Sequence, residues 1–146
     1  MSKKYSLYES IQEKGYKLTE HRKLIIDILI ENMDYLLEPS EIFERVLKKN
    51  KDINFSTIYR NLETFINIGI VRKVSIEDGK SSYQIIFEDQ HIHSLICKNC
   101  GRVEVLKSCP LEKIDMNEIE RKGFQPDSHK FEIYGFCKNC LSSKTP

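Results

Sequence analysis

Hydrophobic residues in the first half of the chain recur at intervals of three and four, the period of an amphipathic helix. Four such segments follow one another, each bounded by residues that typically start or end helices. They cover residues 6–14 before Gly15, the stretch after Thr19, a stretch opened by Pro39, and residues 54–69. The pattern then changes to two β-rich runs, 71–76 and 83–87, around an Asp-Gly turn at 77–80, which predicts a hairpin.

Helices followed by a β-hairpin have the element order of a winged helix-turn-helix. In that architecture the fourth helix would enter the major groove of DNA and the hairpin would lie along the backbone. An ordinary small helical domain would give the same pattern. The hydrophobic pattern alone therefore leaves DNA binding open.

The pattern changes again near residues 88–90. Strands are predicted at 95–97, 103–106 and 130–136, and a helix at 111–121 with Ile114 and Ile119 facing inward. We expect residues 142–146 to be frayed. The predicted fold is α+β, with a DNA-binding domain at 1–87 and a small α/β domain at 88–146.

Composition narrows the classes of protein. The 146 residues are 40% hydrophobic, which is enough for one or two small cores. The net charge is only +1, so contact with DNA would require a local basic surface. No apolar run approaches the length of a membrane span, and the opening residues do not resemble a secretory signal, so we expect a cytoplasmic protein without a membrane partner.

Two Cys-x-x-Cys pairs, Cys97/Cys100 and Cys137/Cys140, dominate the second half. Two such turns can supply the four thiolates of one tetrahedral structural zinc site. Two disulfides are the alternative, since the chain has five cysteines. A reducing compartment favours zinc.

The order of these motifs resembles the ferric uptake regulator family. The matching segments are 55–62, 69–71, His91-x-His93, Cys97-x-x-Cys100-Gly101, His129 and 134–140. The resemblance covers nearly the whole chain. It implies a homodimeric, metal-responsive transcription repressor with an N-terminal winged helix and a C-terminal α/β dimerisation domain that holds a four-cysteine zinc. Such a repressor binds a palindromic DNA operator.

Within that family, residues 107–111 and 128–135 look most like the zinc uptake regulators of Gram-positive bacteria. Iron-sensing and peroxide-sensing relatives share the same framework. We therefore expect control of metal-uptake genes by zinc, with an iron- or peroxide-responsive regulator as the alternative. A DNA-binding regulator with structural zinc only is a further alternative.

The resemblance also implies a regulatory metal site, formed here by His91, His93, Glu112 and His129. Many relatives have aspartate where this chain has His93, so the site is richer in nitrogen. That favours Zn²⁺ over Fe²⁺ or Mn²⁺ as the second metal. The alternative is that these are surface or otherwise satisfied histidines.

A second family site, at the hinge, has lost nearly all its ligands. Its positions correspond to Leu36, Gln84 or Ile86, Ile92 and Ser94. Either the site is lost, which we favour, or a one-residue slip lets His91 and His93 serve it with Glu88 or Asp89.

Cys109 belongs to neither cysteine pair. Most such residues are buried and inert. The alternative is a metal ligand or redox-sensitive thiol near Glu112.

The DNA-reading residues are expected at the start of the fourth helix. Ser56, Thr57, Tyr59, Arg60 and Asn61 would be exposed there, and the resemblance makes Tyr59 and Arg60 the principal readers. A second basic patch that could contact phosphates consists of Lys14, Lys17, His21 and Arg22.

An enzyme is the remaining rival, because His-x-His with a later Glu and His also resembles the metal set of cupin-type oxygenases. That fold needs many more strands than this chain predicts. The sequence has no nucleophile elbow, phosphate loop or paired catalytic acids. We expect no enzymatic activity.

Overall fold

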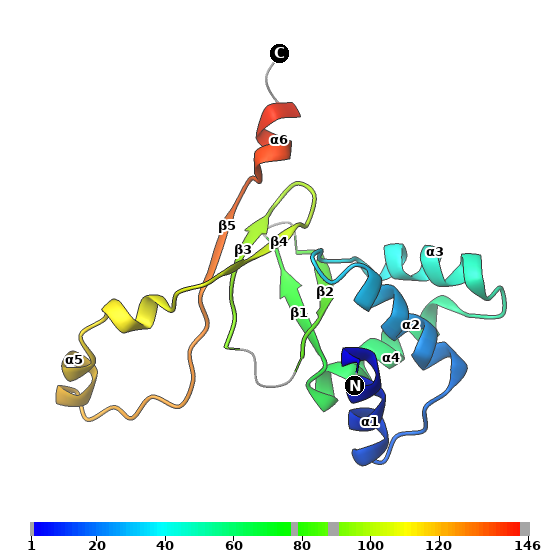
Figure 1. The fold of residues 1–146 in the computed structure, drawn as a ribbon, viewed down its shortest axis with the longest axis horizontal. Helices are drawn as coiled ribbons and strands as arrows, with labels where there is room; N and C mark the ends of the chain where they lie inside the picture. The colour runs from blue at the N-terminus through cyan, green and yellow to red at the C-terminus, as the bar shows by residue number, and fades with distance from the viewer. Residues whose placement is uncertain (1, 77–78, 88–90, 144–146) are drawn as a thin grey trace. The chain divides into compact units, whose positions relative to one another are not determined.

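The computed structural model describes residues 2–76, 79–87 and 91–143 (Figure 1). The chain forms two compact units, Met1–Gln90 and His91–Pro146, and each is described by itself. This division falls three residues beyond the boundary expected from the sequence. Glu88 and Asp89, the oxygen donors of the slipped hinge site, lie outside the described residues.

The first unit begins with four helices: α1 (Lys3–Glu13), α2 (Glu20–Glu31), α3 (Pro39–Lys49) and α4 (Phe55–Ile68). Local capping explains where several of them start and end. The hydroxyl of Thr19 accepts a hydrogen bond from the backbone N–H of Arg22 at 3.3 Å, and α3 opens with Pro39. Gly69 ends α4 in the left-handed conformation, with φ of 89°, which glycine adopts without strain.

These helices pack around one hydrophobic core. Its fully buried members include Ile25 of α2, Ile42 of α3 and Phe65 of α4. A hairpin of β1 (Val71–Ser75) and β2 (Ser81–Ile85) follows, pairing antiparallel from Val71↔Ile85 to Ser75↔Ser81. Tyr83 of β2 is 2% exposed and joins the core, so the hairpin is anchored to the helices as the wing of a winged helix. Strand β2 begins at Ser81, two residues earlier than the run predicted from the sequence.

The second unit is built on a three-stranded sheet in the order β4-β3-β5. The central strand β3 (His93–Cys97) pairs antiparallel with β4 (Val103–Leu106) and parallel with β5 (Glu132–Gly135). The observed α+β architecture confirms the predicted fold class.

Two predictions for this unit are wrong. The single helix at 111–121 is split into a 3₁₀ helix η1 (Pro110–Lys113) and a short α5 (Met116–Arg121), because the Asp115 carboxylate caps α5 by accepting from the N–H of Asn117. Ile114 lies at the break and is 52% exposed, so it does not face inward. The expected fraying from 142 is also corrected, since α6 (Lys138–Ser143) includes Ser142 and Ser143.

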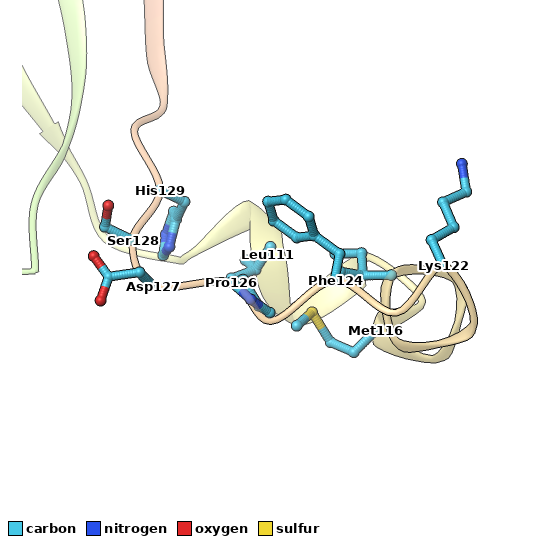
Figure 2. A pocket seen from close by; sticks show the side chains of 9 residues that line it. Leu111, Met116, Lys122, Phe124, Pro126, Asp127, Ser128 and His129 are labelled. Atoms are coloured by element: carbon cyan, nitrogen blue, oxygen red, sulfur yellow. The ribbon is translucent and has the colours of Figure 1, made fainter.

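The connection between β4 and β5, residues 107–131, carries η1 and α5 away from the sheet (Figure 1). Neither helix contains a buried residue or packs extensively against another described helix or strand. Side chains of this connection line an open hollow of about 540 Å³ (Figure 2). This hollow is lined by Leu111, Met116, Ile119, Lys122, Phe124, Pro126, Asp127, Ser128 and His129.

Across the described residues, the helices are too short or too polar to cross a lipid bilayer.

The core of the first unit can be tested at Phe65. Replacing Phe65 with Ala should lower the free energy of unfolding by about 3–5 kcal/mol, because it leaves a cavity among α-helical core residues. Tyr5→Ala, at a side chain that is 61% exposed, should change it by less than about 1 kcal/mol. Urea denaturation followed by circular dichroism measures both values, and equal effects would contradict this assignment of the core.

Candidate metal centres and nucleic-acid interface

Four cysteines converge at the end of the sheet where β3 and β5 terminate. Cys97 ends β3, Cys100 lies in the following turn, and Cys137 and Cys140 lie on either side of the start of α6. Their sulfur atoms lie within 4.8 Å of one another, with Cys100 and Cys137 separated by 3.8 Å. Metal–sulfur bonds of about 2.3 Å in a tetrahedron place sulfur atoms about 3.8 Å apart. The cluster could therefore hold zinc, and each of the five cysteines, all in the described residues, is free of disulfides.

Backbone N–H groups favour the thiolate form of Cys97 in this cluster. Burial alone would raise the pKa of Cys97, but hydrogen bonds from the backbone of Cys100, Cys137 and Asn99 outweigh it and lower the pKa to about 6. One of these donors is the Cys137 N–H, 3.3 Å from the Cys97 sulfur. The pKa of Cys100 is instead raised to about 12 by burial and by the neighbouring thiols. A divalent cation bound here would supply the positive charge that allows all four thiols to ionise.

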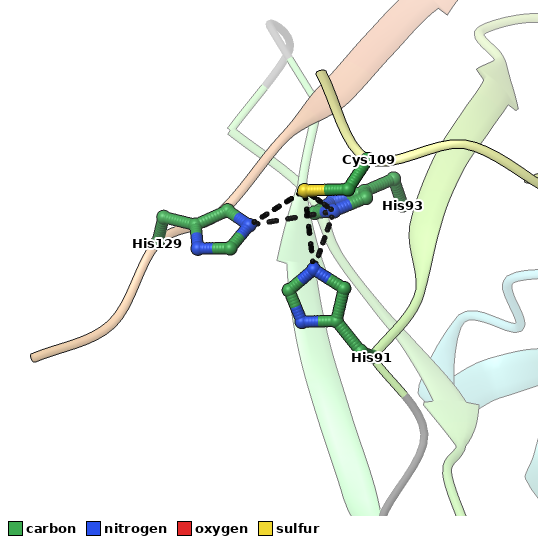
Figure 3. A group of neighbouring side chains, drawn as sticks. All are labelled: His91, His93, Cys109 and His129. Atoms are coloured by element: carbon green, nitrogen blue, oxygen red, sulfur yellow. Dashed lines mark hydrogen bonds between the residues drawn. The ribbon is translucent and has the colours of Figure 1, made fainter. Parts of the chain in front are cut away.

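A second cluster lies at the opposite end of β3 and joins His91, His93, Cys109 and His129 (Figure 3). The His93 Nε2 atom lies 3.0 Å from that of His91 and 3.4 Å from that of His129. The Cys109 sulfur lies 3.3, 3.2 and 3.5 Å from the Nε2 atoms of His91, His93 and His129. A tetrahedral site with imidazole and thiolate ligands places its donor atoms about 3.3–3.6 Å apart.

The sheet brings these residues together from three segments. His93 begins β3 and pairs with Leu106 at the end of β4, after which the chain reaches Cys109. His129 precedes β5, whose parallel pairing with β3 starts at Ser94↔Glu132. The donor positions therefore follow from strand register.

His93 is the buried member of the cluster, at 3% exposure. Burial lowers its pKa, and the charges of His91 and His129 lower it further. Its Nδ1 atom is buried and has no hydrogen-bond partner among the described residues. The lowered pKa favours the neutral ring, the form in which an imidazole nitrogen can bind a metal.

The structure departs from the predicted ligand set at one position. Glu112 is exposed on η1 and is not part of the cluster, and its backbone N–H donates to the Cys109 carbonyl at 3.2 Å. Cys109 is the fourth member of the cluster and is half-buried, not buried. Its expected alternative role, a metal ligand near Glu112, stays a prediction. The sequence signal was the presence of a sulfur donor only three residues before Glu112.

On the first unit, the N-terminal half of α4 presents the predicted DNA-reading side chains. Ser56, Tyr59 and Arg60 are exposed and Thr57 is half-buried. The Tyr59 ring is 44% exposed and packs edge-on against Phe55, with ring centres 5.2 Å apart. The Phe55 ring thus covers one side of Tyr59 and leaves the rest of the side chain in solvent.

Asn61 and Arg22 have a structural role that the sequence did not predict. Asn61 is 8% exposed, which corrects the expectation of exposure. Its Oδ1 accepts from Arg22 Nε at 3.0 Å, while its own Nδ2 donates to the Thr57 carbonyl at 2.8 Å. The Arg22 guanidinium also donates to the Lys17 carbonyl and lies over the Tyr16 ring. Arg22 therefore braces α4 against the loop before α2, whereas Lys17 keeps an exposed side chain.

Comparison with known proteins agrees with this geometry. The model of the ferric uptake regulator family matches residues 13–134. The chain belongs to the ferric uptake regulator family. The ferric uptake regulation protein of Staphylococcus epidermidis is 35% identical over 130 residues, covering 89% of this chain and 90% of that protein.

Solved structures give the same result. A zinc-bound manganese uptake regulator is 30% identical with a TM-score of 0.69, covering 90% of this chain and 98% of its own. The Helicobacter pylori ferric uptake regulator, described as having three functional metal-binding sites, has a TM-score of 0.73 at 24% identity. It covers 97% of this chain and 96% of its own, and its likeness concerns the fold.

The protein is thus a metal-responsive transcription regulator and not an enzyme, in a family whose members bind DNA and form dimers.

The positions of the family's hinge site have other structural uses here. Leu36 is a buried apolar residue. The Gln84 amide accepts from Arg72 Nε at 2.8 Å and donates to the Met33 carbonyl at 2.7 Å.

The bracing role of Arg22 predicts the effect of a charge-conserving substitution. Arg22→Lys should lower the free energy of unfolding by about 1–3 kcal/mol, because it leaves the buried Asn61 oxygen without its donor. Lys17→Ala removes a charge but keeps the carbonyl that Arg22 contacts, so stability should change by less than about 0.5 kcal/mol. Denaturant titration compares the two, and an unchanged stability in Arg22→Lys would leave Arg22 with a phosphate-contact role alone.

Proposed function

We propose that this regulator is a zinc-responsive repressor of metal-uptake genes, acting as a cytoplasmic homodimer on a palindromic operator. The observation that carries the proposal is the convergence of three imidazoles, from His91, His93 and His129, on one point. Such a donor set suits zinc better than Mn²⁺, which prefers oxygen ligands. The four-cysteine cluster would hold a second, structural zinc that does not respond to supply.

We assign the structural role to the four-cysteine cluster and the regulatory role to the histidine cluster because the two differ in solvent exposure and in donor atoms. The structural cluster offers four sulfur donors and has Cys97 and Cys140 buried, so a metal there should exchange slowly. The histidine cluster has His91 and His129 exposed to solvent, so its metal should exchange with the surrounding pool. Five free cysteines also agree with a reducing compartment.

DNA recognition is assigned to the exposed start of α4. Tyr59 and Arg60 would read base edges in the major groove, with Ser56 and Thr57 beside them and Lys17 on phosphate. Metal binding would raise the fraction of dimers whose two α4 helices fit the half-sites of the operator.

Metal content and DNA binding test the proposal together. The purified protein should carry two zinc ions per chain, of which mild chelation removes one, and this loss should abolish binding to the selected operator. His129→Ala, at an exposed position, should retain one zinc and bind DNA equally weakly with or without added zinc. His21→Ala, at the one histidine outside the two metal clusters, provides the matched control for metal content and should retain two zinc ions per chain.

Elemental mass spectrometry and fluorescence anisotropy provide the two measurements, with operators selected from random duplex DNA in the presence of zinc. The selected sequences should contain inverted repeats. Operator binding that is indifferent to chelation would indicate a regulator with structural zinc only. Restoration by Fe²⁺ but not by Zn²⁺ would make it an iron-responsive member of the family.

The DNA-reading assignment has its own test. Arg60→Ala should weaken specific binding by about 1–3 kcal/mol, because a guanidinium can make two hydrogen bonds to a guanine edge. Lys113→Ala removes an exposed charge from the second unit and should leave binding unchanged. Anisotropy titrations at fixed salt compare the two variants, and equal losses would remove Arg60 from the base-reading set.

A further inference from the structure

We infer that the Cys109 thiolate is the fourth ligand of the regulatory metal, so that this site is a three-histidine, one-cysteine centre and Glu112 is not a ligand. The inference rests on the proposed regulatory role of the histidine cluster and specifies its chemistry. It replaces a carboxylate oxygen by a sulfur donor in the site that would sense metal.

The first argument is geometric. The Cys109 sulfur lies 3.2–3.5 Å from all three Nε2 atoms, so it occupies one vertex of a four-atom group and does not merely neighbour one histidine. These separations agree with the edges of about 3.6 Å expected between nitrogen and sulfur in a tetrahedral zinc site.

The second argument concerns hydrogen bonding. A neutral imidazole with its proton on Nδ1 presents a lone pair at Nε2, and a thiolate presents lone pairs at sulfur. In these forms the four atoms direct lone pairs at one another across 3.0–3.5 Å. A cation at the centre satisfies all four lone pairs at once.

The third argument is the isolation of His93. Its ring is 3% exposed, its Nδ1 has no hydrogen-bond partner among the described residues, and its Nε2 points at the Cys109 sulfur and the other two histidines. A buried polar ring is costly unless its polar atoms are used. Metal ligation would use Nε2, the ring nitrogen that faces the other three donors (Figure 3).

Local structure separates Cys109 from Glu112. Cys109 is the residue immediately before η1, and its carbonyl accepts from the Glu112 N–H. The Glu112 side chain is exposed and is not among the converging donors. The thiolate also changes the choice of metal, since sulfur and nitrogen donors favour Zn²⁺ over Mn²⁺ and Fe²⁺.

Cobalt substitution tests the inference, because Co²⁺ occupies zinc sites and reports its ligands by absorption. The full-length protein is used with its four-cysteine zinc retained, which elemental analysis confirms at one zinc per chain throughout. Adding Co²⁺ under reducing conditions should then produce intense tetrahedral visible bands and a near-ultraviolet sulfur-to-cobalt charge-transfer band. Cys109→Ser should lose the charge-transfer band and bind zinc at least about 10- to 100-fold more weakly, the loss typical of supporting groups alone.

Glu112→Gln is the matched control and should keep both the band and the zinc affinity. A cobalt site without the charge-transfer band in the unmodified protein, abolished by Glu112→Gln, would overturn the inference and assign the fourth position to Glu112. It would leave the proposed metal-dependent function intact. Failure of Co²⁺ and Zn²⁺ to bind at all would overturn both, and an unchanged charge-transfer band in Cys109→Ser would also exclude Cys109 as a ligand.

Discussion

Three imidazole nitrogens and one sulfur converge in the second unit to within 4.8 Å of one another, each able to present a lone pair to the same point. Four lone-pair donors in such a group repel one another unless a cation lies between them. Much of the organisation of this unit depends on that constraint, because the donors come from β3, from the end of the β4 connection and from the segment before β5. Satisfying them fixes the relative positions of three pieces of chain.

The same principle applies at the other end of the sheet. His93 begins β3 and Cys97 ends it, while His129 precedes β5 and Cys137 follows it. Metals bound at the two clusters would therefore hold the same pair of parallel strands at opposite ends. This matters because the described residues of the second unit bury few apolar side chains, chiefly Ile96 and Val103, whereas the first unit has a continuous core. A small core of this kind typically needs metal ligation to fold stably.

Local signals made the first unit predictable. Thr19, Pro39 and Gly69 act through their own backbone and nearest neighbours, so the starts and ends that they mark appear in the structure as expected. The prediction of a single helix at 111–121 was wrong. Its apolar spacing was compatible with one helix, but Asp115 caps the start of a new helix, α5. The role of Arg22 could not be predicted either, since its partner Asn61 is distant in sequence and comes close only through packing of α2 with α4.

The choice between Cys109 and Glu112 shows where sequence reasoning by family position ends. The two residues are three apart in the sequence, and the resemblance to the family implied the carboxylate. The decisive factor is that η1 begins directly after Cys109 and leaves the Glu112 side chain in solvent. Because Cys109 and His129 delimit the poorly packed segment that carries η1 and α5, a metal bound to both closes that segment into a loop. Loop closure removes conformational freedom from every residue between its ends. Ligation at this one site thus restricts the segment whose apolar side chains line the hollow beside His129.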